Sequence, residues 1–316
     1  MTLFVLRRLL QVVPVLLVAS VVVFLVIHLV PGDPALAVLG AEARPEQVAA
    51  VRQRMGLDRP LAVQYGLWLG RTLRGDLGAS VINSYPVWSL IGLKVPATAA
   101  LAAGALLVAL LVALPLGVVA AVRQGSAVDR LAVAFSAVGL SIPTFWLGVL
   151  LILAFSLRLQ WLPASGYAPL LDQPLRALRH LALPSVTLGI GMAAILTRFV
   201  RSAMLEVIRQ DFVRTARAKG LAEPRVLARH VFQNAVIPVL TVVALQVGNL
   251  LGGAVVTEAI FEYPGVGQLI LYAVTTKDYP VVQGALLLLV GSFVLINLLT
   301  DVAYALLDPR VRYGRA

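Results

Sequence analysis

The chain has 316 residues, of which 60 % are hydrophobic and only 13 % are charged, with a net charge of +11. An ordinary soluble domain has about 25 % charged residues, so this chain carries too little charge to cover a surface that faces water. The composition therefore excludes a soluble enzyme and indicates an integral membrane protein.

Six apolar runs without a charged residue are long enough to cross a bilayer. They are Leu9–Leu29, Pro96–Val122, Leu131–Leu157, Leu181–Thr197, Ala235–Thr257 and Pro280–Thr300. A helix needs roughly 17–25 such residues to cross about 30 Å of hydrocarbon, and only Leu181–Thr197 is near the lower limit. Buried helices of a large soluble core rarely run so long without a charge. We expect an all-α integral membrane fold with six transmembrane helices.

The first run could be read as a secretory signal peptide, because it follows Arg7 and Arg8 and precedes a loose cleavage motif, Ala35-Leu36-Ala37. The hydrophobic part of a signal peptide spans about 7–15 residues. This run has 21 residues. We therefore expect residues 1–30 to form the first transmembrane helix.

Lysine and arginine concentrate in alternate segments between the runs. The segments on the same side as the N-terminus hold 15 of the 26 basic residues; they are residues 1–8, 123–130, 198–234 and 306–316. The short segments 158–180 and 258–279 hold four. Since cytoplasmic loops are enriched in Lys and Arg, we expect a multi-pass membrane protein with both termini in the cytoplasm. The positive charge is then explained by anionic lipid rather than by nucleic acid.

Motifs of common catalytic sites are absent from the sequence. The three His residues are scattered without an H-E-x-x-H motif, and G-x-S-x-G and G-x-x-x-x-G-K-[ST] do not occur. The absence of Cys excludes disulfides and thiolate metal sites. We expect no catalytic site, metal site or cofactor in this chain, so any ATP that drives it, with its Mg, must bind another polypeptide.

The loop of residues 31–95 is patterned like a folded segment. One short helix is expected from Pro45 to Gly56 and a second from near Pro60, after which Gly75-Asp76-Leu77-Gly78 turns the chain. Two roles remain open for this loop. It either caps the outer membrane face or forms a lip that meets a delivery protein or gates the entrance.

The segment 198–234 combines an apolar stripe with basic residues. The stripe follows helical spacing at Leu205, Ile208, Phe212 and Thr215. The basic residues lie away from it, at Arg209, Arg214, Arg217 and Lys219. Gly220 suits a helix end, and Pro224 starts a second helix that runs into the fifth span. The pattern alone fits both a docking element for a soluble partner and a loop that lies on anionic lipid.

Polar residues inside the spans usually face the interior of a helix bundle. Gln246 and Asn249 lie in the fifth run, and Asn297 and Asp301 lie in the sixth. They either join helices by hydrogen bonds or line a translocation path, for which Gln246, Asn249 and Asn297 are the candidates. Bends are expected at Pro14, Pro115, Pro143 and Pro238.

A family resemblance becomes clear in the segment 198–234. The string DFVRTARAKGL (Asp211–Leu221), followed by H-x-x-x-NAVIP (His230–Pro238), resembles the E-A-A-x-x-x-G cytoplasmic loop of permease subunits in binding-protein-dependent ABC importers. Arg214-Thr215-Ala216 occupy the E-A-A positions and Gly220 the glycine. The Arg and Thr depart from that pattern and are similar to the R-T-A-R-A-K-G string of the dipeptide/oligopeptide/nickel branch.

Further stretches resemble the first, B-type, membrane subunit of that branch along nearly the whole chain. They are PGDP (Pro31–Pro34), MGLDRPLAVQY (Met55–Tyr65), GDLGAS (Gly75–Ser80), SIPTFWLG (Ser141–Gly148), WLPASGY (Trp161–Tyr167), FEYPGVGQL (Phe261–Leu269), DYPVVQG (Asp278–Gly284) and LLDPR (Leu306–Arg310). A single string of this kind would be a weak signal, whereas the ordered set is specific.

The resemblance implies the MetI-like fold of ABC importer permeases, with a folded extracytoplasmic loop after the first helix. Residues 1–30 would be that helix, 31–95 the loop, and 96–316 a five-helix permease core that includes the cytoplasmic coupling loop 198–234. The residues implied in coupling to an ATPase are Asp211, Phe212, Arg214, Thr215, Ala216, Arg217, Lys219 and Gly220.

The resemblance also implies partners and a substrate. The partners are a second homologous permease subunit, two ATP-binding subunits, an extracytoplasmic substrate-binding protein and membrane lipid. The expected function is to form half of a pore that imports dipeptides or oligopeptides by alternating access. The alternatives are an importer of nickel chelates, a stand-alone secondary transporter and an intramembrane enzyme.

Overall fold

The computed structural model describes residues 2–29, 36, 43–55 and 57–307, and this part of the chain is helical without a named strand. Five of its helices are long and apolar enough to cross a membrane, and the number is six when one bent pair of helices is counted as a single span. The predicted all-α fold with six spans is therefore confirmed.

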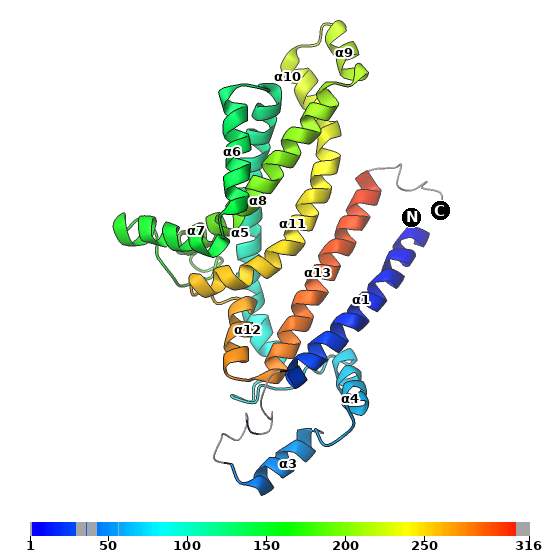
Figure 1. The fold of residues 1–316 in the computed structure, drawn as a ribbon, viewed down its shortest axis with the longest axis vertical. Coiled ribbons are helices and arrows are strands. Elements are labelled where there is room, and N and C mark those ends of the chain that lie inside the picture. The colour runs from blue at the N-terminus through cyan, green and yellow to red at the C-terminus, as the bar shows by residue number, and fades with distance from the viewer. Residues whose placement is uncertain (1, 30–35, 37–42, 56, 308–316) are drawn as a thin grey trace. The chain divides into compact units, whose positions relative to one another are not determined.

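The helices follow the predicted order of the chain (Figure 1). They are α1 (Thr2–Leu29), α3 (Pro45–Met55), α4 (Leu61–Leu73), α5 (Val87–Val122), α6 (Ala127–Ser141), α7 (Thr144–Leu151), the π-helix η1 (Ile152–Arg158), α8 (Pro174–Ile208), α9 (Asp211–Ala218), α10 (Glu223–Arg225), the π-helix η2 (Val226–Phe232), α11 (Gln233–Ile260), α12 (Val266–Thr275) and α13 (Tyr279–Leu307).

The chain divides into two compact units. Unit 1 contains Thr98–Tyr263 and the chain from Ile296 onward, and unit 2 contains Thr2–Ala97 and Pro264–Leu295. The long helices α5 and α13 contribute residues to both units.

Unit 1 is built around α8, on which α6, α7 and α11 pack. Small residues bring α5 close to α8 as well. A side chain at Gly189 would lie 2.6 Å from the carbonyl oxygen of Ala105, and one at Gly117 would lie 2.7 Å from Val200. Such glycines let two membrane helices approach each other closely, so dispersion contacts between their backbones stabilise the pair.

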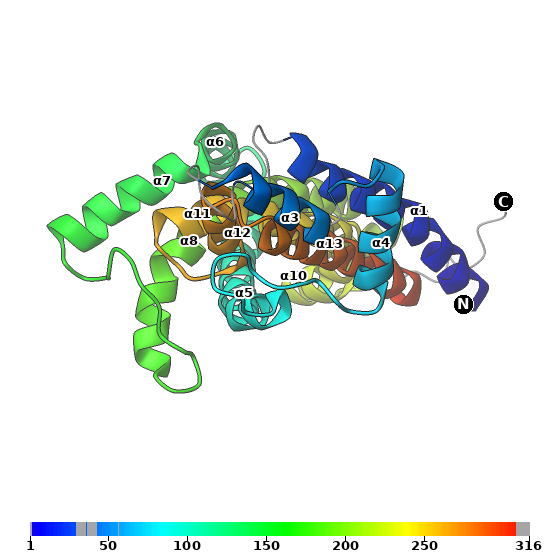
Figure 2. The same cartoon turned by 90° about the horizontal axis from the view of Figure 1, so that it is seen from below.

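The third predicted span, Leu131–Leu157, is broken rather than gently bent. The axes of α6 and the α7–η1 helix differ by 102°, and α7 extends sideways from unit 1 (Figures 1 and 2). The break follows from Pro143, which has no N–H to donate and holds Ile142 in an extended conformation at ψ 121°. The 15 residues of α6 reach only about 22 Å, too short to cross the hydrocarbon alone.

Unit 2 contains the two short helices predicted in the 31–95 loop. Both are confirmed, as α3 and α4, although Gly56 lies outside the described residues. The α4 helix is attached to α1, because Tyr65 shares a 2.8 Å hydrogen bond with Ser20 and packs edge-on against Phe24. The predicted turn is confirmed at Gly75 and Gly78, where φ is +81° and +80°.

The loop after this turn is fastened within unit 2 by one carboxylate. Asp278 accepts hydrogen bonds from the hydroxyl of Ser80 and, at 3.2 Å, from the backbone N–H of Val81. Beside it lies an apolar cluster that joins the start of α5 to α12 and α13, with Val87, Ile91 and Val281 each at most 1 % exposed. The first turns of α5 are thereby anchored to the rest of unit 2.

Candidate functional site

The predicted apolar stripe of Leu205, Ile208, Phe212 and Thr215 is divided between two helices. The α8 helix ends at Ile208 and α9 begins at Asp211, with Gln210 in an extended conformation at ψ 149°. The prediction of a single stripe was therefore wrong. The chain turns between α8 and α9 without a proline or glycine, so the sequence pattern carried no sign of the break.

One face of α9 anchors the helix to unit 1. Val213 and Ala216 are buried in an apolar cluster with Met204 of α8 and with Val226 and Val231 of η2. Of the eight predicted coupling residues, Ala216 therefore points inward. The other seven are exposed: Asp211, Phe212, Arg214, Thr215, Arg217, Lys219 and Gly220.

The outward face of α9 carries an aromatic ring among charges. Phe212 is 46 % exposed. Arg214 lies 3.2 Å from Asp211 in an ion pair between exposed side chains, a kind of pair that contributes little to stability. An exposed aromatic residue beside cations is a typical anchor for a protein partner.

The end of α9 is fixed by its backbone and by one ion pair. Gly220 has φ +76°, and the N–H of Leu221 returns to the carbonyl of Ala216 at 3.4 Å. The predicted left-handed glycine at the helix end is confirmed. Arg217 donates two hydrogen bonds to Glu223 of α10, at 3.0 and 2.6 Å, and these bonds raise the pKa of Arg217. Both side chains are partly exposed, so this link between α9 and α10 makes only a small contribution to stability.

A second ion pair connects α8 to the start of α6. Asp129, 5 % exposed, accepts a 2.9 Å hydrogen bond from Nη2 of Arg201 and a 2.8 Å bond from the N–H of Gly125. Removing either partner would leave the other charge uncompensated, so we expect the loss of one partner to destabilise the contact between α6 and α8. Sequence reasoning missed this pair because Asp129 and Arg201 are far apart in the chain.

The comparisons with known proteins assign this architecture to a family. Residues 113–313 match the family described as binding-protein-dependent transport system inner membrane component, and residues 1–102 match the N-terminal part of such membrane components. The chain belongs to this family. It is a multi-pass component of a bacterial inner membrane and works with ATPase and substrate-binding partners.

Two relatives of this permease are similar along their whole length. The dipeptide transport system permease protein of Alkalihalophilus pseudofirmus is 41 % identical over 330 residues, covering 98 % of this chain and 99 % of the relative. The glutathione transport system permease protein of Salmonella paratyphi A is 42 % identical over 310 residues, with the same coverage.

A solved structure of the MetNI methionine ABC transporter has the same fold. One of its chains aligns with 69 % of this permease, over 96 % of its own length, with a TM-score of 0.58 and 22 % identity. At this identity the comparison shows the fold alone, and the expected MetI-like fold is confirmed.

The polar residues predicted for a translocation path lie on two helices of the permease. Asn249 donates a 3.1 Å hydrogen bond to Gln246 one turn earlier on α11, whereas Asn297 lies on α13. Their role in a path stays a prediction. Among the described residues, no group of three or more His, Cys, Asp or Glu side chains could hold a metal ion.

Proposed function

We propose that this permease forms half of the pore of an ATP-driven importer that carries dipeptides or oligopeptides into the cytoplasm. The names of the relatives support a peptide substrate, because dipeptides and glutathione are both short peptides. The proposed complex contains a second homologous permease subunit, two ATP-binding subunits and an extracytoplasmic substrate-binding protein.

The α9 helix carries this proposal. Its buried Val213 and Ala216 hold it rigidly on unit 1, while Phe212 stands exposed on its outer side. A rigidly seated helix with an exposed aromatic anchor is suited to transmit force from a soluble partner. Since the sequence has no P-loop, that partner supplies the ATP site.

The proposed mechanism is alternating access. ATP binding closes the two ATPase subunits, and α9 moves with the subunit on which it is seated. The apolar cluster passes the movement to α8 and η2, and the pair of Asp129 with Arg201 passes it to α6. Nucleotide shifts the balance between inward-open and outward-open states only through contacts that differ between them, and α9 provides those contacts in this chain.

The proposed orientation places α9 in the cytoplasm and residues 31–95 outside, with both termini in the cytoplasm. It rests on the concentration of Lys and Arg in the segments 123–130 and 198–234. In this orientation residues 96–316 form the permease core, and 198–234 contain the coupling loop.

Phe212→Asp tests the coupling role in the assembled complex. A carboxylate at this position loses the apolar contact and must be desolvated in the partner's cleft, so we expect the ATPase stimulation by substrate-loaded binding protein to fall about tenfold or more. The measurement is the ATPase rate with and without loaded binding protein.

Arg209→Ala is the matched control, because Arg209 lies in the short connection between α8 and α9. Its 3.3 Å bond to Gln124 joins exposed side chains, so its loss changes the rate by less than about twofold. Full stimulation in Phe212→Asp would show that α9 lies on lipid and does not dock to an ATPase.

A further inference from the structure

A carboxyl group is fully enclosed inside unit 1, in the last turn of α11. It belongs to Glu258, which is 0 % exposed within this chain alone, so no partner subunit is needed to bury it. Burying such a group is costly unless hydrogen bonds compensate for the lost water. Ionisable residues in membrane spans therefore tend to mark functional sites. The mechanism proposed above gives Glu258 no role.

The side chain of Glu258 holds α5. Thr98 of α5 is 6 % exposed, and its hydroxyl donates a 2.6 Å hydrogen bond to Oε1 of Glu258. The two residues are 160 positions apart in the sequence, so the bond joins two distant parts of the chain. A hydrogen bond between buried groups is strengthened by the low dielectric constant around it, and its loss is costly. The bond therefore fixes α5 against the end of α11.

The backbone of Glu258 fixes the way in which α11 ends. Its carbonyl oxygen accepts a 2.8 Å hydrogen bond from the N–H of Tyr263, and the carbonyl of Ala259 accepts one of 3.5 Å from the N–H of Glu262. Glu262 has φ +47°, so the helix ends in a Schellman motif. Glycine is the usual residue at the left-handed position, because a side chain there is strained. The surroundings must therefore hold Glu262 in this conformation.

The loop between η1 and α8 braces this turn within unit 1. Phe261 and Tyr263 are only 1 % and 3 % exposed. The N–H of Gly166 donates a 3.2 Å hydrogen bond to the carbonyl of Phe261, and the ring of Tyr167 packs edge-on against Tyr263 with the centroids 5.3 Å apart. The chain after Glu258 is thus held on both sides of the strained residue.

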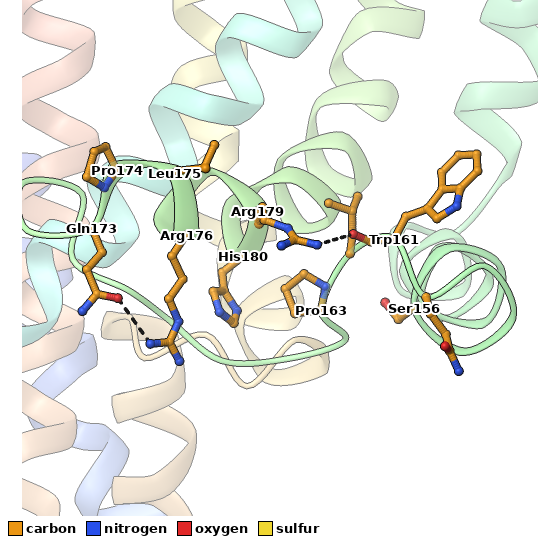
Figure 3. Close-up of a pocket in the computed structure, with 11 residues that line it drawn as sticks. Ser156, Trp161, Pro163, Gln173, Pro174, Leu175, Arg176, Arg179 and His180 are labelled. Atoms are coloured by element: carbon orange, nitrogen blue, oxygen red, sulfur yellow. Dashed lines mark hydrogen bonds between the residues drawn. The ribbon is translucent and has the colours of Figure 1, made fainter.

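The bracing loop is itself fastened to α8 (Figure 3). Arg179 donates a 3.0 Å hydrogen bond to the carbonyl of Trp161, and a ring nitrogen of His180 lies 3.1 Å from the carbonyl oxygen of Ser165. Gly166 turns the chain with φ +102°, and a side chain there would lie 3.3 Å from the ring of His180. The end of α11 is therefore tied to α8 as well as to α5.

Glu258 also lies where the chain passes from unit 1 to unit 2. The central stretch of unit 1 begins at Thr98 and ends at Tyr263. The side chain of Glu258 accepts a hydrogen bond from the first of these residues, and its backbone carbonyl accepts one from the last. One residue therefore fixes both chain segments that leave this stretch, which are the beginning of α5 and the connection to α12.

The other end of α11 belongs to the apolar cluster of α9. Ala235 and Val239 of α11 are buried in this cluster together with Val213 of α9. The helix of 28 residues between the cluster and the last turn is about 42 Å long (Figure 1). Rigid helices and packed side chains carry coupling between distant sites. A movement of α9 therefore reaches Glu258 along α11.

We propose that Glu258 is a positioning residue for transport. Its side chain passes the movement of α11 to α5, and its backbone passes the movement to the chain that leads into α12. This inference rests on the proposed function, because the movement starts at α9. It does not depend on which peptide is carried.

Thr98→Val tests the side-chain link in the assembled complex. Valine keeps the shape of threonine but lacks the hydroxyl, so the carboxyl of Glu258 loses this hydrogen bond. We expect the maximal ATPase stimulation by loaded binding protein to fall about tenfold or more. The concentration of binding protein that gives half of the maximal stimulation should change by less than about twofold, because buried Thr98 presents no surface to that protein. The measurement is the ATPase rate over a series of concentrations of loaded binding protein.

Thr257→Val is the matched control on α11. Thr257 directly precedes Glu258 and is 0 % exposed, but its hydroxyl donates to the carbonyl of Gly253 in the same helix and joins no other helix. The complex with this variant should keep most of its stimulation.

Two conservative variants separate the hydrogen bond from folding. Thr98→Ser keeps a hydroxyl donor and Thr98→Cys replaces it with a weakly donating thiol of similar size. The maximal stimulation should fall in the order serine, cysteine, valine. If the valine variant does not assemble, the comparison of serine with cysteine still decides the matter.

Equal maximal stimulation in Thr98→Val and the unaltered complex would overturn the role of Glu258. An equal loss in Thr98→Val and Thr257→Val would do so too, as would equal stimulation in the serine and cysteine variants. These outcomes leave the coupling role of Phe212 untouched, because Phe212→Asp is measured separately. If loaded binding protein did not stimulate even the unaltered complex, the proposed function itself would fall.

Discussion

At the scale of single residues, Gly220 sets the direction in which the chain leaves α9. Its φ of +76° lies in the left-handed region, and nothing lies within 4 Å of the place where a side chain would begin. The requirement for glycine is therefore conformational and does not come from crowding. The bond from the N–H of Leu221 to Ala216 exists only when Gly220 takes this conformation.

Gly220→Val should reduce coupling while leaving the spans inserted. A branched residue in the left-handed region is strained by roughly 1–2 kcal/mol, so α9 must end differently and present Phe212 at another angle. If the coupled state loses this same free energy, the ATPase stimulation by loaded binding protein should fall by roughly fivefold to thirtyfold.

Gly220→Asn is the control for that variant. Asparagine tolerates the left-handed region better than other residues with a side chain, so most of the stimulation should remain. A similar loss in both variants would contradict the conformational requirement and would point to the loss of a contact at this position.

The sequence predicted the backbone at this site better than it predicted the faces of α9. Left-handed turns at Gly75, Gly78 and Gly220 were foreseeable because glycine is the residue that enters this region cheaply. The inward direction of Ala216 could not be foreseen, because a family motif marks positions without saying which face of the helix is buried. The spacing of Val213 and Ala216, one helical turn apart, was the available signal.

At the scale of helices, α8 is longer than its apolar run indicated. The run Leu181–Thr197 has 17 residues, whereas the helix has 35. The difference arises because Arg176 and Arg179 precede the run and Arg198 and Arg201 follow it, so a charge-free window ends early although the helix continues. The pairing of Arg201 with Asp129 depends on tertiary structure, and the sequence of α8 alone could not show it.

Gly189→Val should disrupt the packing of α8 on α5. A side chain there would meet the carbonyl oxygen of Ala105 at 2.6 Å, and a backbone atom cannot move aside as a flexible side chain can. Overpacking of this kind costs about 1–3 kcal/mol, so we expect a lower melting temperature of the purified complex and less of it in the membrane.

Gly191→Val is the matched control two residues further along α8. No atom lies within 4 Å of its side-chain position, so the melting temperature should stay close to that of the unaltered complex. If both variants melted alike, the effect would come from valine in the helix and not from the contact with α5.

At the scale of the whole molecule, six spans would place both termini on the same side of the membrane. The basic residues decide between the two orientations, and the helix α8 allows a direct test. Leu171 precedes this helix and Lys219 follows it after α9, and both belong to unit 1. A helix of 35 residues is about 52 Å long and exceeds the hydrocarbon thickness of about 30 Å, so we expect its two ends to lie on opposite sides of the membrane.

Cysteine labelling at these two positions should give opposite results in intact cells. The unaltered chain contains no Cys, so each variant carries a single thiol. Leu171 is 95 % exposed and Lys219 is also exposed, so neither substitution disturbs a packed side chain. We expect an impermeant maleimide to label Leu171→Cys in intact cells and Lys219→Cys only after the membrane is permeabilised. The reverse pattern would place α9 outside the cell, where no ATPase could reach it, and would overturn the proposed coupling.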